Sequence, residues 1–530
     1  MTTDHQVDAG DVSTVRRRLR VDHDHPHYKW VALTNTTLGI LLVTINSSIV
    51  IISLPAIFRG IHLNPLAPGN VSYLLWMLMG FLLASAVLVV MFGRLGDMLG
   101  RVKVYNQGFM VFTVSAIALS IDPFDQGGGA LWMIGWRVVQ GVGGAMLMAN
   151  STAILTDAFP ANQRGMALGI NQVAAVGGSF LGLIIGGVLS EWDWRAVFWV
   201  SVPISVLGTV WSYKSLHELG QRSPGKLDIG GTVSFAVGLT ALLAGITYGI
   251  QPYGDSPTGW TNPWVLAGVL GGIAVLVLFC VIESKVAQPM FQLGLFKIRA
   301  FGLGNFAGLM ASVGRGGLQF MLIIWLQGIW LPLHGFDYES TPLWAGIYLL
   351  PLTVGFLAAG PVSGWLSDHY GARPFAVGGL VIVGITFVLL LLIPVDFNYW
   401  LFAGIVFLNG VGSGLFSSPN TAAIMSAVPA NQRGAASGMR GTLFAAFLGF
   451  NPIEELLGTS GELKAPGVNA DVLTGQQFFP HLISGPFHSG LVVVFVAAAI
   501  MMFLGAIAQF FAGGEYMHEA EESRAASERG

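Results

Sequence analysis

Two arginines stand where a permanent cation is costly, and their side chains offer the clearest chemistry in the sequence. Arg137 and Arg315 each lie deep within a long apolar run. A guanidinium inside a bilayer normally faces the protein interior or a water-filled cavity, and it often marks a functional site. Arg137 is predicted either to act in function or to donate structural hydrogen bonds to neighbouring carbonyls. Arg315 is predicted either to bind an anionic or carbonyl-bearing molecule or to pair with backbone groups freed by Gly314 and Gly316.

Amide and aromatic side chains recur in the same apolar runs. A cavity rich in these groups suits large amphipathic molecules, although each group alone would serve equally well as an interhelical hydrogen bond or an interface anchor. None of the 28 Asp and Glu residues falls at the centre of an apolar run, while Asp157 and Glu283 lie near run ends. The candidate cavity residues are Asn46, Asn150, Asn171, Gln172, Arg315, Gln319, Trp325 and Gln327.

The sequence lacks the residue patterns of an enzyme. The apolar runs contain no paired acids, no cluster of metal ligands and no nucleophile next to a base. The single cysteine, Cys280, excludes an intramolecular disulfide and a multi-cysteine metal site. No Gly-x-x-x-x-Gly-Lys-Ser/Thr stretch is present to bind a nucleotide for direct ATP drive. We therefore expect no catalytic residue, no metal and no cofactor.

The composition identifies the solvent in which these residues must be placed. Of the 530 residues, 53% are hydrophobic and only 10% are charged, and the mean hydropathy is +0.67. A soluble chain has roughly 25% charged residues, so this chain cannot cover a water-facing surface. The net charge of -3 offers no basic face for nucleic acid. These numbers exclude a soluble enzyme, a nucleic-acid binder and a disordered chain, and they predict a many-span membrane protein.

Apolar runs separated by polar or Gly/Pro-marked breaks predict fourteen membrane-spanning helices. Each such helix needs about 20 mostly apolar residues. The predicted spans cover residues 30–58, 72–92, 104–121, 131–155, 165–188, 194–214, 229–249, 263–283, 300–331, 343–365, 374–393, 399–426, 434–450 and 487–512.

The distribution of basic residues predicts the orientation of these spans. Cytoplasmic loops of membrane proteins carry an excess of Lys and Arg. With the N-terminus inside, 19 of the 25 Lys and Arg residues fall on the cytoplasmic side, three lie within spans, and only Arg59, Arg195 and Lys464 lie outside. We therefore expect a multi-pass protein of the cell membrane with both termini in the cytoplasm.

The chain contains an internal duplication. Residues 159–165 read FPANQRG and residues 428–434 read VPANQRG, and GRLGD at 93–97 matches GWLSD at 364–368. These offsets of 269 and 271 residues pair spans 1–6 with spans 9–14 and leave spans 7 and 8 as an insert. Parallel repeats of this kind usually place a substrate cavity between two halves that open alternately. The predicted parts are an N-terminal tail (1–29), an N-terminal six-helix bundle (30–214), a two-helix insert with its flanking loops (215–299), a C-terminal six-helix bundle (300–512) and a C-terminal tail (513–530).

Two motifs make the chain resemble the major facilitator superfamily, in its fourteen-span drug:proton antiporter branch. Residues 93–103 read GRLGDMLGRVK, the loop motif most widespread in that superfamily, and residues 137–145 read RVVQGVGGA, its arginine followed by Gln-Gly. The resemblance implies an all-α major facilitator fold, a loop that locks one half against the other, and an arginine implicated in proton coupling. The predicted coupling and latch residues are Arg94, Asp97, Arg101, Arg137, Gln140 and Gly141, which lie in these motifs, and Asp157, an acid near the cytoplasmic end of span 4.

The chain departs from the family pattern at two places. Span 5 keeps the packing glycines Gly178, Gly182 and Gly186, but Leu183 stands where the antiporter motif usually has proline. In span 1, Asn46 stands where the family commonly has an aspartate, and an amide cannot exchange a proton at physiological pH. Close helix packing is expected to survive, and coupling is expected to run through Asp97, Asp157 and Arg137 or else to differ from the usual route.

Span 13 is shorter than its repeat partner. Its apolar run covers only 434–450 and is followed by a long polar stretch, 451–486, that holds Glu454 and Glu455. A short helix with local thinning of the bilayer, the two glutamates at the outer mouth, and a natural deletion all remain open. We expect a short crossing helix, since failure to cross would put the C-terminus outside.

Taken together, these features predict a secondary active exporter of amphipathic small molecules. It is expected to work by alternating access as a proton-coupled antiporter, and to be a monomer whose partners are the substrate, protons and the bilayer. A transporter of a specific metabolite or lipid-like compound, and a non-transporting membrane sensor on the same fold, remain as alternatives.

Overall fold

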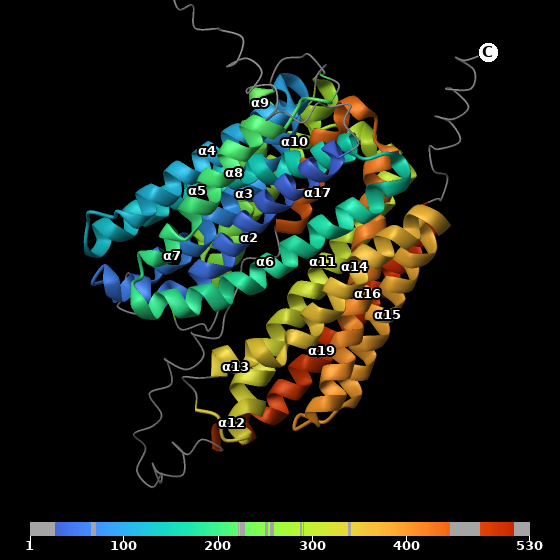
Figure 1. Ribbon diagram of the computed structural model, residues 1–530. Helices are drawn as coiled ribbons and strands as arrows, with labels where there is room; N and C mark the ends of the chain where they lie inside the picture. The colour runs from blue at the N-terminus through green and yellow to red at the C-terminus, as the bar shows by residue number, and fades with distance from the viewer. Residues whose placement is uncertain are drawn as a thin grey trace, which may run out of the picture.

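The computed structural model describes residues 27–64, 70–220, 222, 228–249, 253–254, 259–286, 289, 291–337, 341–445 and 478–512. The long regular elements in this part of the chain are all helices (Figure 1). Thirteen of the described helices are long and apolar enough to cross a membrane. They match the predicted spans other than the thirteenth, so the all-helical fold expected from the sequence is confirmed.

The N-terminal bundle repeats the predicted run of apolar segments closely. Helix α3 packs against α5, α4 packs against both α5 and α8, and α2 packs against α6. The helices of this bundle are α2 (Tyr28–Gly60), α3 (Val71–Leu99), α4 (Arg101–Ser120), α5 (Gln126–Ala158), α6 (Arg164–Trp192), the short α7 (Ala196–Trp199) and α8 (Ser201–Ser215).

The C-terminal bundle repeats this arrangement, with α14 against α16 and α15 against both α16 and α19. A π-helical turn, η4 (Leu326–Trp330), continues α11 into α12. The helices of this bundle are α11 (Arg299–Trp325), α12 (Leu331–Leu333), α13 (Thr341–Tyr348), α14 (Leu350–Tyr370), α15 (Ala372–Leu392), α16 (Tyr399–Ala427), α17 (Arg433–Ala445) and α19 (Phe478–Phe511).

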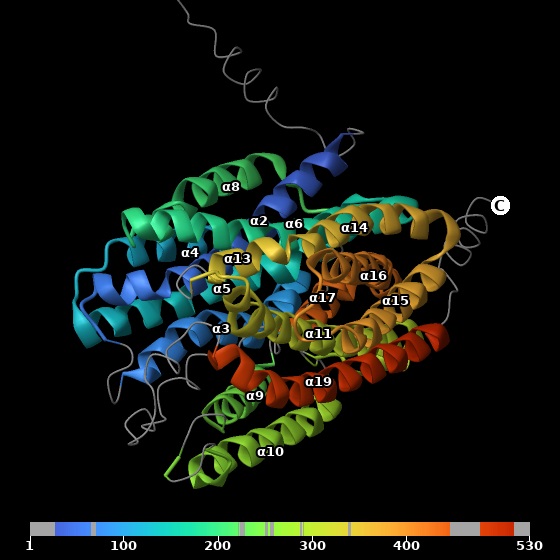
Figure 2. The ribbon, with the colours of Figure 1, turned by 90° about the horizontal axis from the view of Figure 1, so that it is seen from below.

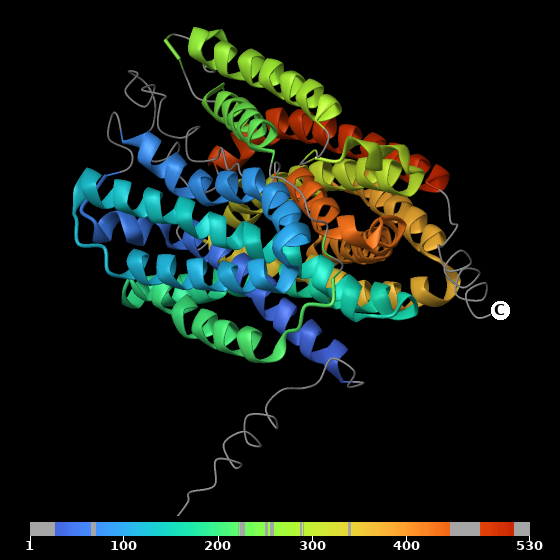
Figure 3. The ribbon, with the colours of Figure 1, turned by 90° about the horizontal axis from the view of Figure 1, so that it is seen from above.

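The two inserted helices lie at the periphery of the molecule. Helices α9 (Ile229–Gly249) and α10 (Pro263–Lys285) pack on each other, and α9 also contacts α3. The indole Nε1 of Trp76 donates to the hydroxyl of Tyr248 at 3.1 Å across that contact. Views from below and above show the pair outside the two bundles (Figures 2 and 3).

The structure differs from the predicted spans at two places and leaves a third untested. The single predicted span 343–365 is two helices, since α13 ends at Tyr348 and α14 begins at Leu350 next to Pro351, which cannot donate a backbone hydrogen bond. Helix α19 begins at Phe478, so part of the stretch predicted as an outer loop is helical. For span 13, α17 is described to Ala445 and residues 446–477 lie outside the described residues, so its crossing stays a prediction.

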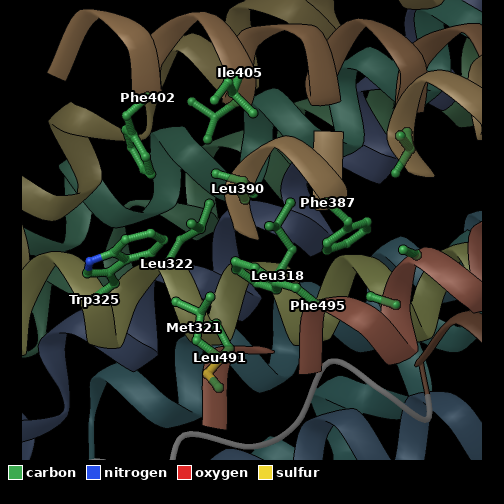
Figure 4. Packing of buried hydrophobic residues seen from close by; sticks show 14 of the residues in the cluster. Leu318, Met321, Leu322, Trp325, Phe387, Leu390, Phe402, Ile405, Leu491 and Phe495 are labelled. Atoms are coloured by element: carbon green, nitrogen blue, oxygen red, sulfur yellow. The ribbon is translucent and has the colours of Figure 1, made fainter. Parts of the chain in front are cut away.

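Aromatic and aliphatic side chains fill the interior of the C-terminal bundle. Trp325 and Phe402 pack with Leu318, Leu322 and Phe387 in one buried cluster (Figure 4). A separate cluster that includes Ile49, Phe58 and Phe198 fills one end of the N-terminal bundle. Each half therefore has apolar packing of its own, while another buried cluster joins the halves through Val90, Ala436 and Met439.

The two halves meet at one end of the molecule and diverge toward the other (Figure 1). Helix α3 packs against α17, and α6 packs against α14. In these helix pairs Gly93 lies against Gly434, and Gly165 lies against Gly364. Further along α6, Gly177 still lies against Leu357. We call this meeting end the clamp end and the opposite end the far end. The clamp end carries both copies of the PANQRG sequence.

Candidate functional site: two carboxylate clamps and a buried arginine

A glycine turn ends the helix that carries each motif aspartate. Gly100 follows α3 with a φ of 112°, and Gly371 follows α14 with a φ of 88°. L-residues with a side chain rarely adopt such positive φ values, so glycine is required here. The two glycines are 271 residues apart, the offset of the surrounding motif. The turns therefore place Asp97 and Asp368 at equivalent positions in the two halves.

Asp97 binds the first turn of a helix from the other half. Its Oδ1 accepts from the backbone N–H of Gly434 at 3.0 Å, and its Oδ2 accepts from that of Ala435 at 2.9 Å. The free N–H groups and the dipole at a helix start favour an anion. The Asp97 residue is only 1% exposed, so these bonds lie out of water. We call this arrangement the first clamp.

Asp368 makes the same arrangement in the opposite direction. Its Oδ1 accepts from the N–H of Gly165 at 2.9 Å, and its Oδ2 accepts from that of Met166 at 3.0 Å. The hydroxyl of Ser418 donates to the carbonyl of Gly165 at 2.8 Å and adds to the contact. We call this arrangement the second clamp. In both clamps an aspartate of one half holds the helix that follows PANQRG in the other half.

Glycines allow the backbones to come this close. A Cβ on Gly434 would collide with the carbonyl oxygen of Gly93, and a Cβ on Gly165 would come within 2.6 Å of the carbonyl oxygen of Gly364. The bulk of any other residue would push the helices apart and lengthen the carboxylate bonds. The glycines of both motifs are therefore part of the clamp geometry.

An ionic network strengthens the first clamp. The guanidinium of Arg101 donates to Asp97 Oδ1 at 3.0 Å from Nε and at 2.7 Å from Nη2. It also pairs with Asp157 and donates to the carbonyl of Ala430 at 2.5 Å. On its other side, Asp157 Oδ1 accepts from Arg433 Nη1 at 3.2 Å. Asp157 therefore lies between one arginine of its own half and one of the opposite half.

The second clamp has no equivalent network among the described residues. At the repeat offsets, Ala372 stands where Arg101 would be, and Ser426 stands where Asp157 would be. Asp368 forms no ion pair with any residue that the structure describes. The duplication has thus kept the carboxylate-to-backbone bonds in both halves and the salt bridges in one.

Arg137 lies in a second polar cluster, inside the N-terminal bundle. Its Nη1 donates to Asn46 Oδ1 at 2.7 Å and to Gln140 Oε1 at 2.9 Å. Its guanidinium carbon also lies 4.5 Å from the ring centroid of Phe81. Asn46 in turn donates to the hydroxyl of Ser201 at 3.0 Å. Arg137 is 1% exposed and is solvated by amides and an aromatic face, without a carboxylate among its described contacts.

The structure thus divides the predicted coupling residues into two groups. Asp97, Arg101 and Asp157 lie together in the first clamp, while Arg137 and Gln140 join Asn46 elsewhere. Two further predicted coupling residues, Gly141 and Arg94, belong to neither hydrogen-bond network. Gly141 packs against the backbone of Phe81 on α3, and the Nε and Nη1 atoms of the buried Arg94 have no hydrogen-bond partner among the described residues.

The predicted cavity residues do not form one continuous lining. Trp325 lies in the core of the C-terminal bundle, because its indole donates to the carbonyl of Val395 at 2.8 Å and its rings pack on Phe397. Asn150 donates to the carbonyls of Met146 at 2.9 Å and Phe92 at 3.4 Å, an interhelical contact. Asn171 donates to Ser151 at 3.4 Å, Gln319 is exposed, and Gln172 and Gln327 are partly buried. Arg315 lines a cavity in the C-terminal half, together with Asn420 and Arg440.

The glycine stripe of α6 lies against α2, as the packing interpretation requires. A Cβ on Gly182 would meet the carbonyl of Ile45 at 2.5 Å, and Gly178 faces Thr44 and Leu41. The hydroxyl of Ser53 donates to the carbonyl of Gly186 at 3.1 Å.

Sequence reasoning left out several residues of these sites. Asp368 and Arg433 carry a usable signal, since each belongs to a repeat copy of a motif that was already recognised. Glu218 accepts from the backbone N–H groups of Arg101 at 2.9 Å and Val102 at 3.1 Å, so it caps α4 from a distant loop. No local sequence pattern predicts that Glu218 caps α4. Arg440 is one of the three basic residues within predicted spans, and it lines the same cavity as Arg315.

Comparison with known proteins places this geometry in a family context. A family model described as Major Facilitator Superfamily matches residues 36–228 and 226–450. The solved structure of the proton:xylose symporter XylE covers 94% of this chain and 99% of its own, with a TM-score of 0.58 at 14% identity. That likeness concerns the fold alone.

Two curated relatives share more sequence. The riboflavin transporter RibZ of Clostridioides difficile (strain 630) is 27% identical over 411 residues, which are 77% of this chain and 83% of the relative. The tetracenomycin C resistance and export protein of Streptomyces glaucescens is 27% identical over 415 residues, or 78% of this chain and 72% of the relative.

Proposed function

The chain belongs to the Major Facilitator Superfamily and is a multi-pass membrane transporter, and from this premise we propose that it is a secondary active exporter of amphipathic small molecules. The single observation that carries the mechanism is the pair of reciprocal clamps, Asp97 on Gly434 and Asp368 on Gly165. The likeness to an antibiotic export protein supports export as the direction.

The arrangement of the halves supports alternating access. The clamps join the halves at one end, while the bundles diverge at the other (Figure 1). The basic residues of the clamp end, among them Arg101, Arg164 and Arg433, favour the cytoplasmic side of a bacterial cell membrane. With the clamp end inside, both termini lie in the cytoplasm and this conformation faces outward. Opening the clamps would admit the substrate from the cytoplasm, with the protein acting as a monomer.

The first clamp offers a route by which protons could drive that opening. Asp97 and Asp157 both act as charged acceptors, toward two N–H groups and two arginines. A proton on either carboxylate removes its charge and turns one oxygen into a donor, which weakens the clamp. Proton binding and opening are then thermodynamically linked, and each favours the other. Asn46 cannot titrate, so its role is to hold Arg137 in place.

The proposal is tested by dye transport in inverted membrane vesicles. An acid-inside pH gradient should drive uptake of an amphipathic dye, and a protonophore should abolish that uptake. Arg137→Ala should remove at least nine-tenths of the uptake while insertion into the membrane stays normal, because Asn46 and Gln140 lose their common partner. The matched control is Arg59→Ala, which removes an exposed arginine from the end of α2.

Three outcomes would contradict the proposal at different points. Uptake that survives the protonophore would exclude proton coupling. Undiminished uptake by Arg137→Ala would exclude the arginine from the mechanism. Absence of uptake under every gradient, in vesicles with normal amounts of protein, would exclude dye export.

The likeness to RibZ, named as a riboflavin transporter, supports one alternative, a transporter specialised for a single metabolite. Competition distinguishes the two. A broad exporter should be inhibited by many unrelated amphipathic compounds, whereas a specialised transporter should be inhibited by riboflavin-like compounds alone.

A further inference from the structure

A small cavity lies inside the C-terminal half, apart from both clamps. It lies among α11, α16 and α17 and has room for about two water molecules, so it can hold a small ligand group such as a carboxylate. The lining residues are Gly304, Asn305, Gly308, Leu309, Ala311, Ser312, Arg315, Phe416, Ser417, Asn420, Ile424 and Arg440.

Two arginines and no acid line this cavity. Arg315 comes from α11 and Arg440 from α17, and neither aspartate nor glutamate is among the described lining residues. Arg315 also lies over the ring of Phe356, 5.0 Å from its centroid. Two cations that face one low-dielectric space repel each other and are poorly hydrated there. An anion between them would offset both effects.

The other polar groups of the lining donate mainly to helix backbone. Asn305 donates to the carbonyl of Phe301 at 2.8 Å, Ser312 to that of Gly308 at 2.8 Å, and Asn420 to that of Gly304 at 3.2 Å. The guanidinium groups, each with five N–H donors in a planar fork, are therefore the strongest donors that the cavity offers to a ligand. This fork matches the oxygens of a carboxylate, sulfonate or phosphate.

The rest of the lining is apolar or accepts hydrogen bonds. Leu309, Phe416 and Ile424 supply hydrophobic surface. The buried Oδ1 of Asn420 has no hydrogen-bond partner among the described residues, so it can accept from a ligand hydroxyl or amine. The lining thus suits a molecule with an anionic group, an apolar body and a donor.

The positive charge is not part of the duplicated scaffold. At the repeat offset of 269, Arg315 corresponds to Asn46, and Arg440 corresponds to Asn171. The N-terminal half therefore builds the same positions with neutral amides. A role in the shared packing of the two halves does not account for guanidinium groups in one half only.

We propose that this cavity, which we call the anion pocket, binds the anionic group of an amphipathic substrate between Arg315 and Arg440. The substrate class of the exporter would then be amphipathic organic anions. This inference rests on the proposed function for its biological meaning, but the binding step can be measured without transport.

The test uses the purified full-length protein in a non-ionic detergent and two matched fluorescent probes. 1-Pyrenebutyrate carries a carboxylate, and 1-pyrenebutyramide is its neutral counterpart. Fluorescence titration should show the carboxylate binding at least tenfold more tightly. Arg315→Gln and Arg440→Gln should each remove this preference, and Arg315→Lys should keep part of it, since it retains the charge without the planar fork.

Two further variants protect the test from failure to fold. Ser312→Asp keeps both arginines and adds a carboxylate to the pocket. It should therefore lower the affinity for the carboxylate probe at least tenfold and leave the affinity for the amide probe unchanged. Arg373→Gln removes an arginine that stacks on Phe510, 4.0 Å from the ring centroid, outside the pocket, and should leave the preference unchanged.

Equal affinity of the two probes for the wild-type protein would overturn the inference, and so would a preference that survives both glutamine variants and Ser312→Asp. Failure of the two proposals can be told apart. Dye export without any preference for the anionic probe would support the exporter proposal and reject the anion pocket. A preference for the anionic probe that depends on the arginines, in a protein that exports no dye, would support the anion pocket and reject the exporter proposal.

Discussion

The two clamps are built from the same duplicated sequence, but they differ in strength. In both, an aspartate accepts from the first two N–H groups that follow the arginine of PANQRG. Asp97 is almost fully buried and also binds Arg101, which joins it to Asp157 and Arg433. Asp368 is partly exposed and accepts two backbone bonds beside Ser418, and the described residues around it give weaker electrostatic interactions with Arg164 and His369 but no ion pair. Water weakens charge-assisted bonds, so the first clamp should hold the halves more firmly.

This difference indicates which contact controls opening. A contact that costs little to break can open and close without deciding the equilibrium between two states. The first clamp brings together two carboxylates and two arginines, and the pairing of buried charges depends strongly on protonation. We therefore expect the transport cycle to respond mainly to the first clamp.

Removing the two clamp aspartates separately should give the largest contrast. Asp97→Ala removes two backbone bonds and leaves Arg101 without one of its partners, which should destabilise the clamped state by roughly 3–5 kcal/mol. Asp368→Ala, the matched variant, should destabilise the clamped state by about 1–2 kcal/mol. Spin labels are placed on cysteines at the exposed far-end positions Val188 and Val354, in a Cys280→Ser background. Double electron–electron resonance then measures the distance between the labels and so the populations of the clamped and open states.

Asp97→Ala should shorten the far-end distance in most molecules, whereas Asp368→Ala should leave most of them clamped. Dye uptake should fall at least tenfold in the first variant and by about twofold to threefold in the second. Equal effects of the two substitutions would remove the distinction between the clamps.

Asp157→Asn should have an intermediate effect, since it keeps the backbone bonds of the first clamp and removes only the ionic link between the halves. The asparagine can still accept from Arg433 or Arg101, so we expect about a fivefold loss of dye uptake. The variant should also respond less to the imposed pH gradient, because the carboxylate that links Arg101 to Arg433 is absent. A response to the gradient equal to that of the wild-type protein would exclude Asp157 from coupling.

Ser426→Asp should have the smallest effect and tests the comparison in the opposite direction. It places a carboxylate where the repeat has Asp157, in the region of Arg164, the counterpart of Arg433. A partly exposed pair stabilises by about 0.2–1 kcal/mol, so the clamped population should rise and dye uptake should fall by no more than about twofold. Ser426→Asn is the neutral control. Faster uptake by Ser426→Asp alone would show that the second clamp does not oppose opening.

Much of the fold could be predicted because bilayer physics acts on local sequence. A spanning helix must satisfy its own backbone and be apolar over about 20 residues, and α9 accordingly covers the predicted range 229–249. The predictions failed where local composition is ambiguous. The polar stretch before α19 gave no sign that its helix starts at Phe478, and Pro351 divided a run that is apolar throughout.

The sequence by itself determined the membrane-spanning helices, the duplication and the motif residues Asp97, Arg101 and Arg137, because apolar runs, repeats and rare charges are all readable along one chain. Only the tertiary structure decided what these residues bind. Asp97 meets Gly434 across 337 residues, and Asn46 meets Arg137 across 91, because the bundle folds these segments together. The joint position of Arg315 and Arg440 at one cavity has the same origin, since no local pattern records which helix faces meet.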